Sequence, residues 1–191
     1  MIDKNKIGFL LLLLFMGSFT SFAQNIAISN NLLLDLDRAL SMGIEIPGAN
    51  KTSLELYGSI RPWKRSEQTV HKHWMVQAQY RFWPCQVMNG FFAGPYVHGG
   101  EFNIGNHSMP FRLLKGLESQ RYEGWLAGVG IGAGYEYALA RHWNVGAEVG
   151  IGYTYINYKQ YNCEVCGPQK DNSVYQYVGL SKLALSLIYV F

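Results

Sequence analysis

Apolar and polar positions alternate along most of the chain after residue 24, which is the period of a β-strand with one apolar face. The clearest case is the segment 121–158, where two alternating runs flank the short connection 139–142. In the first run, Trp125 and Ile131 fall on one face, while glycines and Glu136 fall on the other. Helical spacing is almost absent, so the pattern predicts an all-β chain.

The same alternation predicts eight strands. They are expected at 25–34, 40–46, 52–61, 72–83, 90–103, 121–138, 143–158 and 174–191. The short connections are 47–50, 85–89 and 139–142. The long connections are 62–71, 104–120 and 160–173, and only the first connection, 35–39, breaks the order. An even number of strands with short turns at one end and long loops at the other is typical of outer-membrane barrels. We therefore expect an eight-stranded antiparallel up-and-down transmembrane β-barrel.

The N-terminal segment has the features of a secretory signal peptide. Lys4 and Lys6 precede an apolar run, which is followed by a small-residue site ending at Ala23. The run is shorter than the roughly 20 residues that a membrane-spanning helix needs. We expect cleavage of residues 1–23, a barrel domain over 24–191, and localisation in the outer membrane.

Alternation alone does not distinguish a membrane barrel from a soluble one, because a lipocalin-like barrel alternates with its apolar face inward. Three features favour the membrane: glycines crowd the polar face, the chain ends inside its last strand, and aromatic residues gather near strand ends. Such aromatic residues form interfacial girdles. They are Trp74, Phe82, Trp83, Trp125, Tyr135, Tyr137, Trp143, Tyr153, Tyr155, Tyr189 and Phe191. Pro95 falls inside a strand, where we expect a bulge or bend.

Charged residues on the polar face predict a network inside the barrel. Its expected members are Glu45, Glu55, Arg61, Arg81, Glu136, Glu148 and Lys182, with Gln77 and Gln79 bridging them. The interior of an eight-stranded barrel is just wide enough for side chains to fill, and buried charges need partners. The network is either an ion path or proton relay, or a salt-bridged plug that does not conduct. We favour the plug.

Few other residues indicate chemistry. The net charge is only +3, which gives no reason to expect nucleic acid as a partner. Cys163 and Cys166 lie in the last long loop, where an oxidising compartment favours a disulfide over a free or metal-bound pair. Cys85 lies in a short turn at the opposite end and is expected to stay unpaired. We expect no cofactor and no metal site.

The third long connection contains one helical signal. Ser108 and Pro110 suit a helix start, and the next residues place three apolar side chains on one face, namely Phe111, Leu114 and Leu117. This face either docks a partner or folds back over the barrel mouth. Residues for a rim active site are also present in the loops, namely Ser66, Glu67, His71, His107 and Ser108. Nothing in their spacing requires catalysis, so we expect no enzyme.

Two long segments, 71–100 and 122–153, together with CEVC and the terminal LIYVF, resemble a domain-of-unknown-function family of small secreted barrels encoded near fimbrial gene clusters. The motifs that carry the resemblance are Arg81-Phe82-Trp83 and Gly124-Trp125. The resemblance implies outer-membrane residence and an accessory role in surface fibres or attachment. It implies no active site.

The last residues, Leu183 to Phe191, alternate and end on an aromatic residue. This end resembles the C-terminal signal of outer-membrane barrels, in which Tyr189 and Phe191 are read by the barrel assembly machinery. We therefore expect a small non-enzymatic barrel with a structural or surface-interaction role, in contact with outer-membrane lipid and with fimbrial or surface proteins. The alternatives are a soluble periplasmic barrel that binds an apolar ligand and a rim-active enzyme acting on lipid or peptide.

Overall fold

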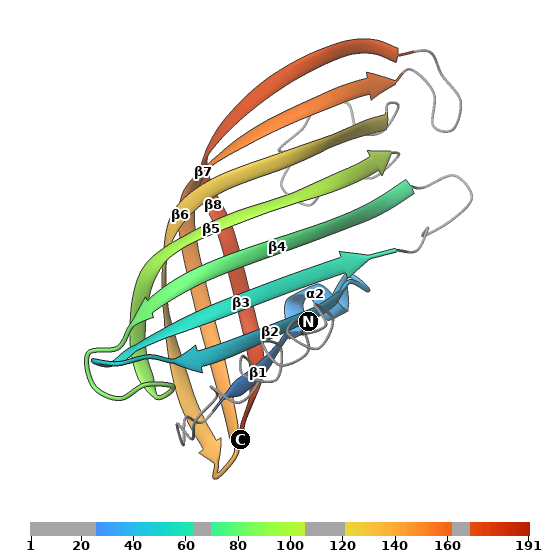
Figure 1. Cartoon of the computed structure of the whole chain (residues 1–191). Helices are drawn as coiled ribbons and strands as arrows, with labels where there is room; N and C mark the ends of the chain where they lie inside the picture. Colours follow the sequence, from blue (N-terminus) through green and yellow to red (C-terminus); the bar gives the residue numbers. More distant parts are fainter. Residues whose placement is uncertain (1–25, 63–69, 106–120, 162–168) are drawn as a thin grey trace, which may run out of the picture.

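Eight antiparallel strands close into one barrel, and each strand pairs with its neighbours in the sequence (Figure 1). The computed structural model describes residues 26–62, 70–105, 121–161 and 169–191. The strands are β1 (Ala27–Asn31), β2 (Leu40–Pro47), β3 (Thr52–Arg61), β4 (Val70–Phe82), β5 (Gly90–Gly105), β6 (Arg121–Ala140), β7 (Trp143–Tyr161) and β8 (Gln169–Val190). The barrel closes because β8 also pairs with β1, with Ala27 opposite Val190. The predicted eight-stranded antiparallel barrel is confirmed, while the predicted signal peptide lies outside the described residues.

The strands differ in length around the barrel. β1 and β2 are short, whereas β6, β7 and β8 are each about 20 residues long and extend far past the shorter strands (Figure 1). The short connections that follow β2, β4 and β6 lie together at one end, which we call the turn end (Figure 1). The opposite end, where the long connections leave the barrel, is called the loop end.

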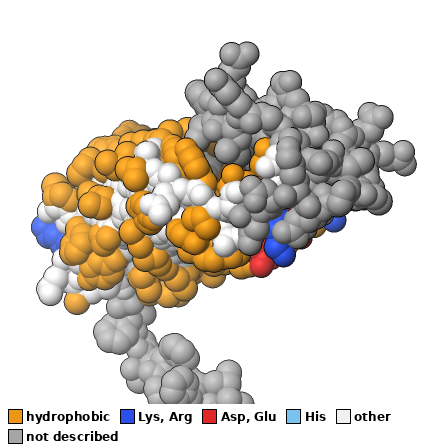
Figure 2. All heavy atoms as spheres, turned by 90° about the horizontal axis from the view of Figure 1, so that it is seen from above, with side chains coloured by type: hydrophobic (Ala, Val, Ile, Leu, Met, Phe, Trp, Pro, Cys, Tyr) orange, Lys and Arg blue, Asp and Glu red, His pale blue; other side chains and the backbone are white. Residues whose placement is uncertain are grey.

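Side chains alternate between an exposed apolar outer surface and a buried polar interior. The exposed large apolar residues include Met42, Leu56, Val76, Val97, Val129, Ile131, Val149, Ile151, Leu183 and Leu185. The buried charged residues are Glu45, Glu55, Arg61, Arg81, Glu136 and Glu148. On the part of the surface that Figure 2 colours, apolar side chains predominate and charged ones lie near its two ends. The distribution is the reverse of a water-soluble barrel, in which the apolar face is turned inward.

The first strand is shorter than predicted, because the chain turns into a one-turn helix, α2 (Leu32–Leu36). The expectation of a strand to residue 34 is therefore wrong. Asn31 keeps an extended backbone and its side-chain oxygen accepts a hydrogen bond from the Leu33 N–H at 3.1 Å, which is the geometry of a helix N-cap. The described residues contain no helix long and apolar enough to cross a membrane.

The irregularity expected at Pro95 takes another form. The pairing of β4 with β5 has the same register on both sides, with Gln79 opposite Tyr96 and Phe82 opposite Ala93. The two pairs in between are missing, since proline has no N–H to donate. No bulge forms at this site, although β5 curves in its first half (Figure 1).

Candidate functional site

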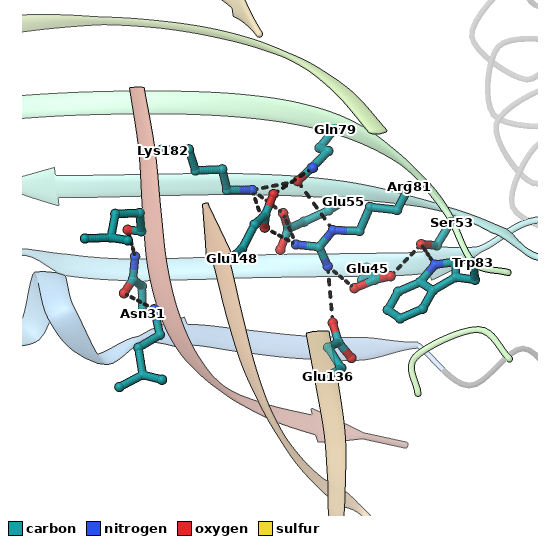
Figure 3. Close-up of polar contacts among 12 residues, drawn as sticks. Asn31, Glu45, Ser53, Glu55, Gln79, Arg81, Trp83, Glu136, Glu148 and Lys182 are labelled. Atoms are coloured by element: carbon teal, nitrogen blue, oxygen red, sulfur yellow. Dashed lines mark hydrogen bonds and ion pairs between the residues drawn. The ribbon is translucent and has the colours of Figure 1, made fainter. Parts of the chain in front are cut away.

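The centre of the barrel interior is organised around the guanidinium group of Arg81, which enters from β4 and is only 4% exposed. Its Nη1 lies 2.5 Å from Oε2 of Glu45 and 3.4 Å from Oε1 of Glu136. Its Nη2 lies 2.7 Å from Oε2 of Glu55 and 2.9 Å from Oε2 of Glu148. One cation thus contacts carboxyl groups from β2, β3, β6 and β7 (Figure 3).

Lys182, from β8, extends the network toward the loop end. Its Nζ lies 2.8 Å from Glu148 and 3.3 Å from Glu55, and it donates a 2.6 Å hydrogen bond to Oε1 of Gln79. Gln79 in turn donates from Nε2 to Glu148 at 2.7 Å. We call this set the lumen cluster: Glu45, Glu55, Gln79, Arg81, Glu136, Glu148 and Lys182. It joins six of the eight strands across the interior (Figure 3).

Positive and negative charges in the lumen cluster do not balance. Four carboxyl groups face one guanidinium and one ammonium group, so full ionisation leaves two negative charges uncompensated. Glu136 has the longest contact with Arg81, and its Oε2 has no hydrogen-bond partner among the described residues. Buried charge of one sign is costly, so the cluster depends strongly on its two cations.

Arg61 was also expected in this network, but the structure places it elsewhere. It is buried near the loop end, where Nη1 pairs with Asp37 from the segment between α2 and β2. Asp37 is missed by strand alternation because it lies in a connection. Without Arg61, the lumen cluster has two cations instead of three for its four carboxyl groups.

Aromatic side chains close the turn end of the cluster. Trp83 is buried, donates from Nε1 to Oγ of Ser53 at 2.8 Å, and packs against Phe92 with ring centroids 4.8 Å apart. Ser53 donates to Glu45 at 2.5 Å, and the Arg81 guanidinium lies 4.4 Å from the Phe92 ring centroid. The expectation that Trp83 belongs to an outer girdle is therefore wrong. Successive residues of a strand point to opposite faces, so Trp83 points inward because Phe82 points outward.

Glycines on β6 and β7 make room for large side chains in the interior. A Cβ at Gly130 would lie 2.5 Å from Cζ of Tyr96, and one at Gly134 would lie 2.5 Å from Cζ of Phe92. Both distances are too short for a real contact, so only glycine fits opposite these rings. The glycine-rich face found in the sequence is therefore the surface against which Tyr96 and Phe92 fill the barrel.

Ser181 is an interior residue that the sequence argument missed. The pairing of β7 with β8 shifts between Gly150 and Ile151, so that Gly150 faces Lys182 while Ile151 faces Leu180. This bulge turns both Ser181 and Lys182 inward, where Ser181 bonds the hydroxyl of Tyr96 at 2.5 Å. The signal was present in the sequence, since outward apolar residues change from even to odd positions between Leu180 and Leu183.

A second polar layer lies next to the lumen cluster on its loop-end side. Register places Tyr57, Gln77 and His98 opposite one another on β3, β4 and β5. His98 Nε2 bonds Thr154 Oγ1 at 3.1 Å, whereas Nε2 of Gln77 has no partner among the described residues. Gln77 therefore does not bridge the charges as expected, and Gln79 does.

The C-terminal aromatic residues pack at the turn end. Tyr189 lies edge-on to Trp143 at 5.1 Å and to Phe191 at 4.9 Å, and the Phe191 N–H donates to Ile26. That the barrel assembly machinery recognises Tyr189 and Phe191 stays a prediction.

Most of the other expected site residues cannot be compared with the structure. Outside the described residues are Cys163, Cys166, Phe111, Leu114, Leu117, Ser66, Glu67, His107 and Ser108; of His71 only the backbone is described. The disulfide, the partner-binding face and the rim site therefore stay predictions. Cys85 is exposed and unpaired in the described structure. No group of three or more His, Cys, Asp or Glu side chains in the described ranges is placed to hold a metal ion.

Fold and interior together define a closed eight-stranded antiparallel barrel with a buried ion-pair cluster. Comparison with protein families then gives a match to the family described as "Protein of unknown function (DUF3575)" over residues 9–191. The chain belongs to this family, which confirms the expected membership of a domain-of-unknown-function family. No curated protein matches the chain.

Proposed function

We propose that the protein is an outer-membrane barrel with a plugged interior, which serves as a non-enzymatic structural or interaction protein at the cell surface. The observation that carries this proposal is the exposed apolar outer surface around a charged interior. Contiguous apolar surface of this extent is rare on soluble monomers. Lipid would cover this surface, and the closed barrel would leave no unpaired strand edge in the bilayer.

The dimensions of the apolar surface also suit a bilayer. On β4, outward apolar positions run from Trp74 to Phe82, close to the roughly nine to eleven residues of a tilted membrane strand. Exposed Trp74 and Trp125 lie at the loop-end limit of this surface, and exposed Phe82 and Trp143 lie at the turn-end limit. Aromatic residues at both limits are typical of the two interfacial girdles of membrane barrels.

The lumen cluster supports a structural role for the interior. Arg81 and Lys182 contact carboxyl groups from opposite walls, and Tyr96 and Phe92 fill the remaining width. An ion would have to displace these pairs to pass. We therefore propose that the barrel does not conduct and that its contribution lies at its surface, with an accessory role in fimbriae or attachment.

Two other functions have less support. A soluble barrel that binds an apolar ligand needs an apolar interior, but the interior residues here are mostly charged, amide or hydroxyl-bearing. A rim-active enzyme needs residues from the long loops that the structure does not describe.

A lysine scan of the outer surface tests the proposal. Ile131 is 65% exposed near the middle of the outward face of β6, and Leu139 lies on the same strand at the turn end. In a bilayer, Ile131→Lys should lower the free energy of unfolding by about 2–4 kcal/mol and Leu139→Lys by about 0–1 kcal/mol. The measurement is reversible denaturant unfolding in vesicles, together with heat-modifiable gel mobility in the outer-membrane fraction.

Opposite results would count against membrane residence. In a water-soluble barrel, lysine in place of an exposed isoleucine has little cost at either position. Equal unfolding free energies for both variants, with the protein in the soluble fraction, would contradict the proposal.

A further inference from the structure

A hollow of about 610 Å³ lies at the loop end of β3 to β7, lined mainly by outward residues together with Arg61, His73 and Phe102. Two rows of side chains across neighbouring strands line it. The lower row is Trp74, Glu101 and Trp125, which register places opposite one another on β4, β5 and β6. The upper row, on β4 to β7, is Lys72, Asn103, Glu123 and Lys159. We call this feature the rim hollow.

Glu101 occupies an unusual position in the lower row. It is an exposed carboxylate on the outward face, flanked by two half-exposed indoles at the limit of the apolar surface. Nε1 of Trp74 donates to its Oε2 at 3.0 Å, which fixes the carboxylate between the rings. No ion pair joins Glu101 to any described residue. The hydrogen bond from Trp74 holds the carboxylate at the N–H edge of that indole, where its remaining lone pairs can accept hydrogen bonds from an ammonium group.

The upper row contains charges of both signs, because Glu123 on β6 lies between Asn103 and Lys159, while Lys72 on β4 lies opposite Asn103. Lys72 and Lys159 are exposed and form no ion pair with the described residues. Lys72 lies two residues beyond Trp74 on β4, a step of about 6–7 Å, whereas Lys159 lies on β7, three strands from Lys72 and opposite Glu123. The rim hollow therefore offers a site for a positive group next to a site for a negative one, directly above apolar side chains such as Val76 and Val129.

We propose that the rim hollow binds the phosphoethanolamine headgroup of a membrane lipid. Glu101 accepts hydrogen bonds from the ammonium group between Trp74 and Trp125, while Lys72, two residues beyond Trp74 on β4, binds the phosphate. The acyl chains then lie along the apolar outer surface, which is continuous with the hollow. The lipid is favoured over a peptide or a second copy of the chain because both charge signs meet at the limit of that surface. This inference rests on the proposed membrane location.

The test uses the mature full chain and soluble dihexanoyl lipids, with adducts measured by native mass spectrometry in a non-ionic detergent. The phosphoethanolamine lipid should bind roughly tenfold more tightly than the phosphoglycerol lipid, because only the former has an ammonium group to pair with Glu101. Glu101→Gln should abolish this preference. The single variant Lys72→Gln should weaken both lipids, and the distant control Arg141→Gln should change neither.

Equal binding of the two lipids, or an unchanged preference in Glu101→Gln, would overturn the inference. A dimer that depends on Glu101 would overturn it in favour of a second copy as occupant. A missing lipid preference can be told apart from a failed membrane proposal. The lipid test uses soluble lipids, whereas the lysine scan is a separate measurement of membrane residence. A protein that passes the scan but shows no headgroup preference is a membrane barrel without this site.

Discussion

Arg81 holds four carboxyl groups at one point of the barrel interior, and the local packing depends on this single side chain. Its planar fork reaches Glu45 and Glu136 with one nitrogen and Glu55 and Glu148 with the other. Lysine has one point charge and no fork, so it cannot reproduce this arrangement. Removal of the guanidinium leaves buried like charges with Lys182 as their nearest cation.

We predict that Arg81→Met lowers the free energy of unfolding by about 3–5 kcal/mol, because removing one partner of a buried ion pair leaves the others uncompensated. Denaturant unfolding of the refolded protein in detergent or vesicles measures the loss. Arg141→Met, at an exposed turn, is the matched control and should change stability little. Equal stabilities of the two variants would show that the cluster contributes nothing.

Gly150 provides a second test at the residue scale. A Cβ there would lie 2.8 Å from Cε1 of Tyr96 and 3.0 Å from Cβ of Lys182. Gly150→Ala should destabilise the barrel by about 1–3 kcal/mol through overpacking. In the background of Tyr96→Ala the same change should cost much less, since its main clash is gone.

Gly58 is the control for this substitution, because a Cβ there would find Met75 O at 3.9 Å as its nearest neighbour. Gly58→Ala should be neutral or slightly stabilising. The same unfolding assay measures the double variant. If the costs of Gly150→Ala and Tyr96→Ala simply add there, then Gly150 is not needed to make room for the Tyr96 ring.

At the scale of elements, the bulge in β8 lets two consecutive residues face inward. Ser181 bonds Tyr96, and Lys182 joins the lumen cluster. Beyond the bulge, Leu183, Leu185 and Leu187 continue the exposed apolar surface. The extra residue thus adjusts the register of the closing strand without turning its apolar face inward.

A pair of deletions tests this register. Deleting Ser181 should remove the bulge and keep the alternation of the whole strand, with loss of about 1 kcal/mol for the Tyr96 hydrogen bond. Deleting Ser186, where alternation is regular, should turn Leu187 and Tyr189 to the wrong face and prevent folding. The folded fraction on a heat-modifiable gel measures both. Similar folding of the two deletions would contradict the assigned register.

The sequence predicted elements more reliably than it predicted contacts. The strand ranges, and the face of the barrel to which each side chain points, followed from alternation. Alternation with a period of two is a local pattern, and the short turns join strands that are neighbours in the sequence. The Asp37 partner of Arg61 did not follow, since it depends on packing between distant segments. The helix at Leu32–Leu36 was also missed, although its N-cap Asn31 is local. The aromatic character of Trp83 suggested an outer girdle, but its position in the alternation turns it inward.

At the scale of the whole molecule, apolar residues lie on the outside and polar residues inside, which is the reverse of a soluble fold. Charged groups with few exceptions are paired inside or lie at the ends, while large apolar side chains cover the outside. In water the outer surface would drive aggregation, and in lipid it would be solvated. The membrane proposal therefore concerns the entire outer surface, and a test of it must sample outward and inward positions alternately.

Spin labels placed singly along the middle of β6, from Val129 to Ala133, make that test, with the native cysteines replaced. In vesicles, labels at the outward positions 129, 131 and 133 should be highly accessible to oxygen and poorly accessible to a water-soluble nickel complex. Labels at the inward positions 130 and 132 should be poorly accessible to both, or fail to fold because Tyr96 and Glu148 occupy that space. Nickel accessibility at the outward positions equal to that of a label at the exposed turn residue Arg141 would contradict a lipid-covered barrel.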